Sequence, residues 1–243
     1  MIIALPMAGR GSRFEGAGFE QPKPLIPVHD VPMFVKSLQS VKNLEYTLLA
    51  IIALQEHEER FEISAIIEKY NISNAKLILI PDVTKGQLCT VMALSDLLNT
   101  DEDLLVMGSD TIVVSDLGSH LKEHLKNCDG AISVFDLPGD RWSFAKTDER
   151  GNVIQVAEKV RISNHACTGL YYFKHSSIFK SLAEKMIAGN ETTKGEFYVM
   201  PLYQKMIDLG MNIGISIAKE MWDLGTPEAL NLYYQHFPDA HEH

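Results

Sequence analysis

The sequence predicts an α/β fold in which a mixed, mostly parallel sheet is flanked by helices. Strand-like and helical segments alternate over the first 130 residues, which is typical of βαβ units. Residues 47–54 are almost wholly apolar, as expected for a parallel strand covered on both faces. The sequence therefore indicates a Rossmann-like arrangement, in which ligands collect at the carboxyl ends of the strands.

The first half supplies strands and helices in alternation. We expect strands at residues 2–5, 47–54, 76–80 and 104–107, and helices near residues 32–41, 56–70 and 87–98. The glycine-rich turn after the first strand and the segments that follow Ile80 and Met107 all begin at such strand ends. These three segments are therefore expected to converge on one crevice.

The pattern changes after about residue 130 to shorter strands joined by turns. We expect strands at residues 131–135, 143–146, 153–156 and 168–173, a hairpin turn at 148–152, and helices near 175–187, 196–209 and 226–236. No repeat or low-complexity stretch interrupts the chain. We therefore expect a single domain over residues 1–243, made of a first half (1–130), a second half (131–237) and a tail (238–243).

Composition restricts the partners and the compartment. A net charge of −10 and a sequence pI near 5.3 argue against nucleic acid or an anionic membrane surface as a partner. No segment approaches the roughly 20 apolar residues that span a bilayer, and the apolar run before Arg10 is too short for the core of a signal peptide. Three widely spaced cysteines without a C-x-x-C pair indicate a reduced, cytoplasmic setting: Cys89, Cys128 and Cys167.

The turn after the first strand combines glycines with cations. Gly9 and Gly11 allow main-chain N–H groups to approach phosphate oxygens closely. The planar guanidinium of Arg13 can donate two hydrogen bonds to a phosphate. Lys23, which lies between two prolines, can supply a compact positive charge. The alternatives are a dinucleotide fingerprint without its third glycine, which is a weak match, and a plain glycine-rich turn with surface cations. The P-loop pattern is absent.

Residues 9–14 (GRGSRF), followed by residues 22–25 (PKPL), resemble the signature of the sugar-phosphate nucleotidyltransferases, the sugar-nucleotide pyrophosphorylases that include glucose-1-phosphate thymidylyltransferases. Four further stretches match the family in the right order, so the resemblance covers most of the chain. It implies the nucleotide-diphospho-sugar transferase type of fold. It also implies a nucleotide-binding first half, an acceptor-binding second half, and a need for Mg²⁺.

The resemblance also suggests the residues that hold the nucleotide. Gln87 follows a glycine at an expected helix start, where its amide can donate to and accept from a base edge. The alternative for Gln87 is an exposed polar residue on the first turn of a helix. The other expected nucleotide-binding positions are Leu5, Met7, Ala8, Gly9, Gly11 and Ser12.

Two aspartates are candidate magnesium ligands. Asp110 lies just beyond an apolar strand, in a G-S-D sequence where the family usually has a G-D pair. Asp223 lies in residues 222–228 (WDLGTPE), which resemble the family's W-x-D-x-G-T-x-E element contracted by one residue. Two carboxylates suffice for Mg²⁺ when a triphosphate supplies further oxygens. The alternative for each aspartate is a cap on the turn or helix that follows it.

The acceptor side is suggested by Glu158 and Lys159, and by Gly169 ten positions further on. These positions resemble the family's E-K-P element and the G-[IL]-Y strand after it, although Val160 stands where proline is usual. The resemblance implies that Glu158 accepts hydrogen bonds from sugar hydroxyls and that Lys159 holds the sugar phosphate. The alternative is a solvated Glu–Lys pair at a strand end.

The resemblance thus implies transfer of a nucleoside monophosphate from a nucleoside triphosphate to a sugar 1-phosphate, with release of pyrophosphate. Arg13, Lys23 and Asp110 are the expected catalytic residues, and Asp110 and Asp223 the expected metal ligands. The partners are then the triphosphate and a phosphorylated small-molecule acceptor, and a homo-oligomer is left open. Two alternatives stay open as well: an acceptor that is not a sugar, and a non-catalytic nucleotide-binding module.

Overall fold

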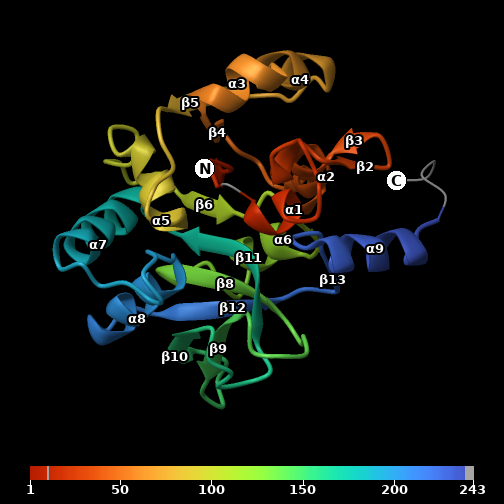
Figure 1. The fold of residues 1–243 in the computed structure, drawn as a ribbon. Helices are drawn as coiled ribbons and strands as arrows, with labels where there is room; N and C mark the ends of the chain where they lie inside the picture. Colours follow the sequence, from red (N-terminus) through yellow and green to blue (C-terminus); the bar gives the residue numbers. More distant parts are fainter. Residues whose placement is uncertain (10, 239–243) are drawn as a thin grey trace.

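A nine-stranded mixed sheet connects the two halves of the chain (Figure 1). The computed structural model describes residues 1–9 and 11–238, so that most of the expected tail lies outside the described residues. The strands follow the order β10-β9-β11-β6-β1-β4-β5, and β8 and β12 extend the sheet beside β11. The predicted class, a mostly parallel central sheet flanked by helices, is confirmed.

The first half forms the parallel part of the sheet. Its strands are β1 (Ile2–Pro6), β4 (Leu48–Leu54), β5 (Ala75–Ile80) and β6 (Leu104–Met107). β1 pairs in parallel with β4 and β6, and β4 pairs in parallel with β5. Ile2 and Ala4 enter the core on one face of the sheet, whereas Ile3 and Leu5 enter the core on the other. Burial on both faces explains why β4 and β6 are apolar at every position, whereas the edge strand β5 contains Lys76 and is partly exposed.

The second half adds antiparallel strands. These are β8 (Gly130–Phe135), β9 (Ser143–Thr147), β10 (Val153–Glu158) and β11 (Ala166–Phe173). β11 runs antiparallel to β6 on one side and to β8 on the other, and so joins the two halves. The sequence did not predict β12 (Ile213–Ile217), which pairs in parallel with β8.

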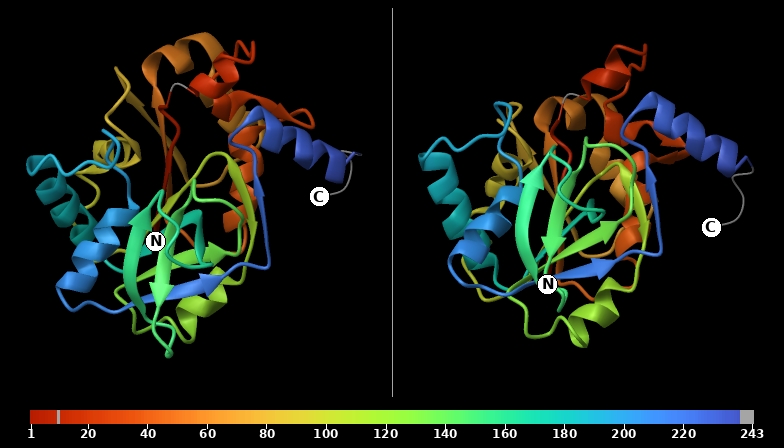
Figure 2. Two further views of the ribbon diagram at one scale, coloured as in Figure 1. Left: turned by 60° about the horizontal axis from the view of Figure 1, so that its bottom comes forward. Right: turned by 90° about the horizontal axis from the view of Figure 1, so that it is seen from below.

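Helices cover both faces of the sheet (Figure 2). One face packs against α5 (Gln87–Val91), α7 (Ser176–Ala188) and α8 (Met200–Asp208). The other packs against α2 (Met33–Ser37), α3 (Gln55–Phe61), α4 (Ile63–Lys69) and α6 (Leu117–Lys122). None of the helices in the part of the chain that the structure describes is long and apolar enough to cross a membrane.

Several predicted helices differ from the observed ones. The single helix expected over residues 56–70 is two helices, because Glu62 adopts a left-handed conformation with φ of 49° between α3 and α4. The helix expected from residue 196 begins only at Met200, and residues 189–199 form a loop. The helices expected at 32–41 and 87–98 are shorter, and each continues as a 3₁₀ helix, Leu38–Val41 and Met92–Leu94.

Short elements outside the large sheet bring the two ends of the chain together. β7 (Thr111–Val114) pairs antiparallel with β13 (Glu220–Asp223) in a register that places Asp223 opposite Thr111. α9 (Pro227–His236) then packs on the hairpin of β2 (Pro27–Val28) and β3 (Val31–Pro32). The sequence did not predict β2, β3, β7 or β13. The register of β7 with β13 sets the distance between Asp110 and Asp223.

Candidate active site

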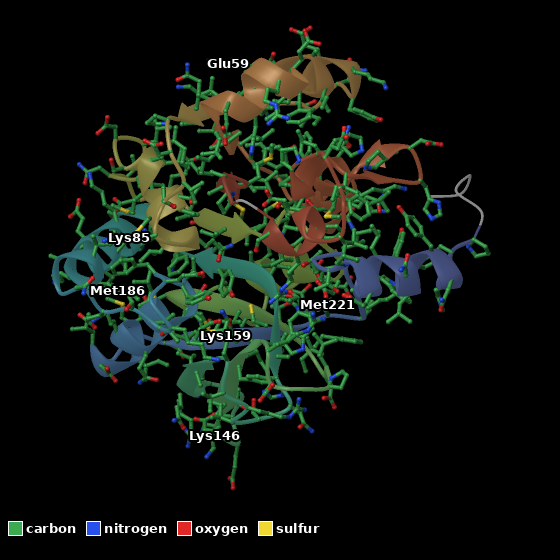
Figure 3. The ribbon with its side chains drawn as sticks, viewed as in Figure 1. Glu59, Lys85, Lys146, Lys159, Met186 and Met221 are labelled. Carbon is green, nitrogen blue, oxygen red and sulfur yellow. The ribbon has the colours of Figure 1, made fainter. Side chains whose placement is uncertain are left out.

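An open cleft of about 660 Å³ lies at the carboxyl ends of β1 and β6. The first half lines it with residues 6–9, 11–14, 83–87 and 108–110, so the three segments expected at strand ends do meet. The second half contributes residues that include Lys159 and Tyr198. Figure 3 labels Lys85 and Lys159, which belong to the first and the second half respectively. The cleft therefore lies between the two halves.

The glycine turn packs directly on the segment that carries Lys23. Gly11 has φ of 65°, and a Cβ atom on it would lie 2.8 Å from Cβ of Lys23. A short helical turn, α1 (Ser12–Glu15), follows; Phe14 within it is buried and Arg13 is exposed at the cleft. Burial of Phe14 anchors the turn, and the lack of a side chain at Gly11 lets Lys23 approach it.

Lys23 forms an ion pair with Asp110 on the floor of the cleft. Its Nζ donates a hydrogen bond to Oδ2 of Asp110 at 2.5 Å, and each side chain is about one quarter exposed, 25% and 26%. Burial raises the pKa of the Asp110 carboxyl, but the ammonium of Lys23, the backbone N–H and the hydroxyl of Thr111 outweigh it, so the pKa lies below its usual range. The Asp110 carboxyl is therefore ionised at neutral pH.

The second aspartate lies next to the first. A Cβ atom on Gly225 would lie 2.8 Å from Oδ2 of Asp110 and 3.0 Å from Oδ1 of Asp223. The N–H of Gly225 also donates to Oδ1 of Asp223 at 3.0 Å. Both carboxylates therefore point at the space that a side chain at position 225 would fill. Asp223 also accepts a hydrogen bond from Nη2 of Arg141 at 2.6 Å.

This pair of carboxylates fits magnesium. Mg²⁺ prefers carboxylate oxygens and is commonly held by one or two of them, with water and substrate phosphates completing the octahedron. The absence of a side chain at Gly225 leaves room between Asp110 and Asp223. Among the described residues no cluster of three or more histidine, cysteine or acidic side chains could form a protein-only metal site. A cation here would depend on the ligands of a bound phosphate compound.

The loop that leads into α5 is bonded to the loop before α8. The N–H of Phe197 donates to the carbonyl of Lys85 at 2.8 Å, and its carbonyl accepts from the N–H of Leu88 at 3.0 Å. Gln87, the first residue of α5, lines the cleft between these bonds. Gly86 makes this approach possible, because its φ is 120° and a Cβ atom there would lie 2.6 Å from the carbonyl oxygen of Phe197.

Replacing Gly86 by alanine is expected to destabilise the protein by about 3 kcal/mol, since it adds both backbone strain and a steric clash. Urea unfolding followed by circular dichroism measures this loss. Gly151→Ala is the matched control, because Gly151 has φ of 85° with nothing near its added Cβ. That control should lose about 1 kcal/mol from strain alone. Equal losses in the two variants would show that contact with Phe197 does not matter.

The second half brings Glu158 and Lys159 to the cleft. Oγ of Ser143 donates to Oε2 of Glu158 at 2.5 Å, across the antiparallel pair of β9 and β10. Burial raises the pKa of Glu158 above its usual range, although the hydrogen bond from Ser143 and the charge of Lys159 act in the opposite direction. Gly169, at an irregularity in β11, accepts from the N–H of Gly108 at 3.1 Å and so borders the floor of the cleft.

Sequence reasoning missed Tyr198. Its hydroxyl accepts a hydrogen bond from Lys159, whose ammonium lies 4.2 Å from the centre of its ring. Burial and a hydrogen bond with Glu196 raise the pKa of Tyr198, and the charge of Arg13 partly offsets this effect. Tyr198 therefore contacts or faces cations from both halves of the chain. Lys159 and Arg13 are distant from Tyr198 in sequence, and its own segment carries no motif that would have identified it.

The predicted site residues divide into three groups. Those that line the cleft are Met7, Ala8, Gly9, Gly11, Ser12, Arg13, Lys23, Gln87, Asp110 and Lys159. Glu158, Gly169 and Asp223 adjoin lining residues without being part of the wall. Leu5 is fully buried and packs in the core beneath the turn, so it supports the site from below.

Sequence comparison places this chain among known proteins. The sequence model of a protein family described as nucleotidyl transferase matches residues 3–238. The low-salt glycan biosynthesis nucleotidyltransferase Agl11 of Haloferax volcanii is 23% identical over 226 residues, which cover 90% of this chain and 61% of Agl11. The bifunctional protein GlmU of Methanococcus maripaludis is 25% identical over 225 residues, which cover 90% of this chain and 50% of GlmU. The chain therefore spans about half to three fifths of the length of these curated relatives.

Solved structures of other proteins have the same fold as this chain. A nucleoside-diphosphate-sugar pyrophosphorylase from Vibrio cholerae RC9 superposes with a TM-score of 0.80 and 28% identity, covering 96% of this chain and 99% of that one. An inositol-1-phosphate CTP transferase from T. maritima shares the fold, with a TM-score of 0.76, 14% identity, and coverage of 96% and 93%. Since the family match extends over residues 3–238, the protein belongs to the nucleotidyl transferase family.

Proposed function

We propose that the protein transfers a nucleoside monophosphate from a nucleoside triphosphate to a sugar 1-phosphate and releases pyrophosphate. One observation carries this proposal: Arg13 lines the same cleft in which Lys23 pairs with Asp110, and Asp223 lies beside Asp110. Membership of the nucleotidyl transferase family supports it. A site for binding alone would not need two neighbouring carboxylates beside a phosphate turn.

The chemistry follows from charge. An acceptor phosphate oxygen attacks the α-phosphorus, a new P–O bond forms, and the bond to the β-phosphate oxygen breaks, so that pyrophosphate leaves with its electron pair. Because both reactants are anions, the main tasks of the site are to neutralise their charges and to align them for attack. The attacking phosphate is already ionised, so no general base is required. Arg13 stabilises the leaving pyrophosphate, and Lys23 binds near the α-phosphate.

Asp110 and Asp223 would hold the Mg²⁺ ion, which supplies neutralisation of the phosphate oxygens when it is bound. In the protein alone, each carboxylate is paired with a cation, Lys23 for Asp110 and Arg141 for Asp223. The pair with Lys23 holds the pKa of Asp110 below its usual range, so Asp110 stays ionised beside Asp223. When a triphosphate binds in the cleft, the ammonium of Lys23 can exchange its bond to Asp110 for a bond to a phosphate oxygen.

Specificity is assigned to the two walls of the cleft. Gln87 and the main chain of Met7 and Ala8 read the base. Glu158 accepts hydrogen bonds from acceptor hydroxyls, and Lys159 binds the acceptor phosphate. A phosphorylated acceptor other than a sugar is the second candidate. It is favoured by Val160, which is exposed at the position of the family's usual proline, directly after Lys159 with its left-handed φ of 56°.

A grid of triphosphates against phosphorylated acceptors tests the proposal. Each pair is incubated with Mg²⁺, pyrophosphate is measured, and the product mass identifies the acceptor. We expect pyrophosphate to appear with a sugar 1-phosphate and one preferred triphosphate. Release only with a non-sugar phosphate would select the second candidate, and no release from any pair would leave a binding module.

Replacing Glu158 by glutamine is expected to separate stability from activity. Folding raises the pKa of Glu158, so the ionised carboxylate costs stability at neutral pH. The stability that its protonated form provides is complete below the unfolded pKa and is lost as the pH rises through the folded pKa. The variant should therefore show a Tm about 2 °C higher at neutral pH, while the KM for the acceptor rises about tenfold.

Calorimetry at neutral and mildly acidic pH, with steady-state kinetics, measures both effects. The gain in Tm should shrink as the pH falls, because wild-type Glu158 is then protonated as well. Glu149→Gln, an exposed site in the turn between β9 and β10, is the matched control and should change neither quantity. A lower Tm for Glu158→Gln at neutral pH would contradict the assigned pKa direction.

A further inference from the structure

Arg141 lies where the metal side and the acceptor side of the site meet. Its guanidinium donates to Oδ2 of Asp223 at 2.6 Å, while Oδ1 of the same carboxylate faces Asp110 across Gly225. The side chain of Asp223 is 16% exposed and that of Arg141 is 47% exposed. Asp223 is therefore the more buried partner of the pair, and Arg141 is the more exposed one.

The backbone next to Arg141 belongs to the acceptor side. The carbonyl of Trp142, the next residue, accepts from the N–H of Lys159 at 2.9 Å. Ser143 follows and donates to Glu158. The two residues that follow Arg141 thus bond to the two residues assigned to the acceptor, Trp142 through the main chain and Ser143 through its side chain, while the side chain of Arg141 bonds to Asp223.

The loop that carries Arg141 is held firmly. Nη1 of Arg161 donates to the carbonyls of Leu137 and Gly139, at 2.6 and 2.9 Å. The indole of Trp142 donates to the carbonyl of Pro138 at 3.1 Å, and the guanidinium of Arg141 lies 4.3 Å from the centre of that indole ring. The loop can therefore stay in place while the side chain of Arg141 changes its partner by rotation.

We propose that Arg141 is an acceptor-binding residue that changes partner: Asp223 holds it in the free protein, and a divalent cation at Asp223 releases it to bind the acceptor phosphate. The inference rests on the proposed function. A dication held by Asp223 would repel the guanidinium bonded to the same carboxylate, and this repulsion would weaken the ion pair. A phosphate oxygen then offers Arg141 a bidentate partner of the opposite charge.

This exchange makes metal binding and acceptor binding interdependent. Because the cation frees Arg141, it raises the affinity for the acceptor phosphate; by linkage, a bound phosphate raises the affinity for the cation. Without the cation, Arg141 neutralises Asp223 and is not free for the acceptor. The acceptor is therefore held well only after the metal site is filled.

Two binding measurements that do not depend on turnover test the exchange. Mn²⁺ is titrated into the protein without substrates and followed by the electron paramagnetic resonance signal of the free ion. Inorganic phosphate is titrated by calorimetry with and without saturating Mg²⁺. The variants are Arg141→Gln and, as a matched loss of one exposed arginine, Arg150→Gln in the turn between β9 and β10. Circular dichroism confirms that each variant folds.

Arg141→Gln should bind Mn²⁺ about fivefold more tightly than wild type, because no guanidinium then competes with the metal for Asp223. The fivefold change corresponds to the free energy of about one surface ion pair. Saturating Mg²⁺ should raise the affinity for phosphate in wild type and in Arg150→Gln. In Arg141→Gln the factor by which Mg²⁺ raises this affinity should be about fivefold smaller. Unchanged Mn²⁺ affinity in Arg141→Gln, or an equal effect of Mg²⁺ on phosphate in all three proteins, would overturn the inference. Failure of every substrate pair to release pyrophosphate would instead defeat the proposed function, and these titrations would still decide the exchange.

Discussion

Replacing Arg13 by alanine is expected to lower turnover by about two orders of magnitude or more, as for the loss of a positioned donor that stabilises developing charge. Arg13 is exposed at the cleft, and its position is set by the buried side chain of Phe14 rather than by bonds of its own guanidinium. Alanine therefore removes charge from the proposed site of the leaving pyrophosphate without disturbing the core. Steady-state pyrophosphate release with the preferred substrate pair measures the loss.

Two further variants identify the cause of this loss. Arg13→Lys keeps one positive charge but loses the planar fork, so it should recover only part of the activity. Arg150→Ala removes an exposed arginine outside the cleft and should keep wild-type turnover. Wild-type turnover in a folded Arg13→Ala protein would exclude Arg13 from charge stabilisation.

Replacing Asp110 by asparagine is expected to remove nearly all Mg²⁺-dependent pyrophosphate release, by about two orders of magnitude or more. The change keeps the shape of the side chain but removes the charge that pairs with Lys23 and that would bind the cation in the proposed reaction. The unpaired ammonium of Lys23 then repels a metal ion at Asp223. Titration of activity against Mg²⁺ measures the effect, and raising the Mg²⁺ concentration should not restore the rate.

The stability of this variant should also change with pH. Folding lowers the pKa of Asp110, so its contribution to stability is complete above the unfolded pKa and is lost as the pH falls through the folded pKa. Asp110→Asn should therefore be less stable than wild type at neutral pH, and the difference should narrow in acid. Asp96→Asn, at an exposed aspartate, is the matched control. Full activity of Asp110→Asn at ordinary Mg²⁺ concentrations would remove Asp110 from the metal site.

The parallel half of the sheet could be read from the sequence because its signal is local. Residues 48–54 are apolar at every position since both faces are covered, and that pattern is visible without knowledge of any partner. The four-residue strands β7 and β13 carry no comparable signal. Each becomes a strand only by pairing with the other, more than 100 residues away. Glu62 breaks a helical pattern that propensity alone would continue.

The candidate site, like the sheet, could be predicted from the sequence only in part. The sequence motifs pointed to Arg13, Lys23, Asp110 and Asp223. In the structure the first three line one cleft, and Asp223 adjoins it. Their ion-pair partners could not be derived, because Lys23 is 87 residues from Asp110 and Arg141 is 82 residues from Asp223. The roles assigned to these residues, the cytoplasmic location and the exclusion of nucleic acid and membranes stay predictions.

The pairing of β13 with β7 has a consequence for biosynthesis. Asp223 ends β13, whereas the turn with Arg13 and the strand before Asp110 belong to the first half. A nascent chain on the ribosome can thus form the phosphate turn and the parallel strands long before residues 220–223 have been translated. During that interval the cations are present without the second carboxylate, so the two carboxylates come together only after β13 has emerged and paired with β7.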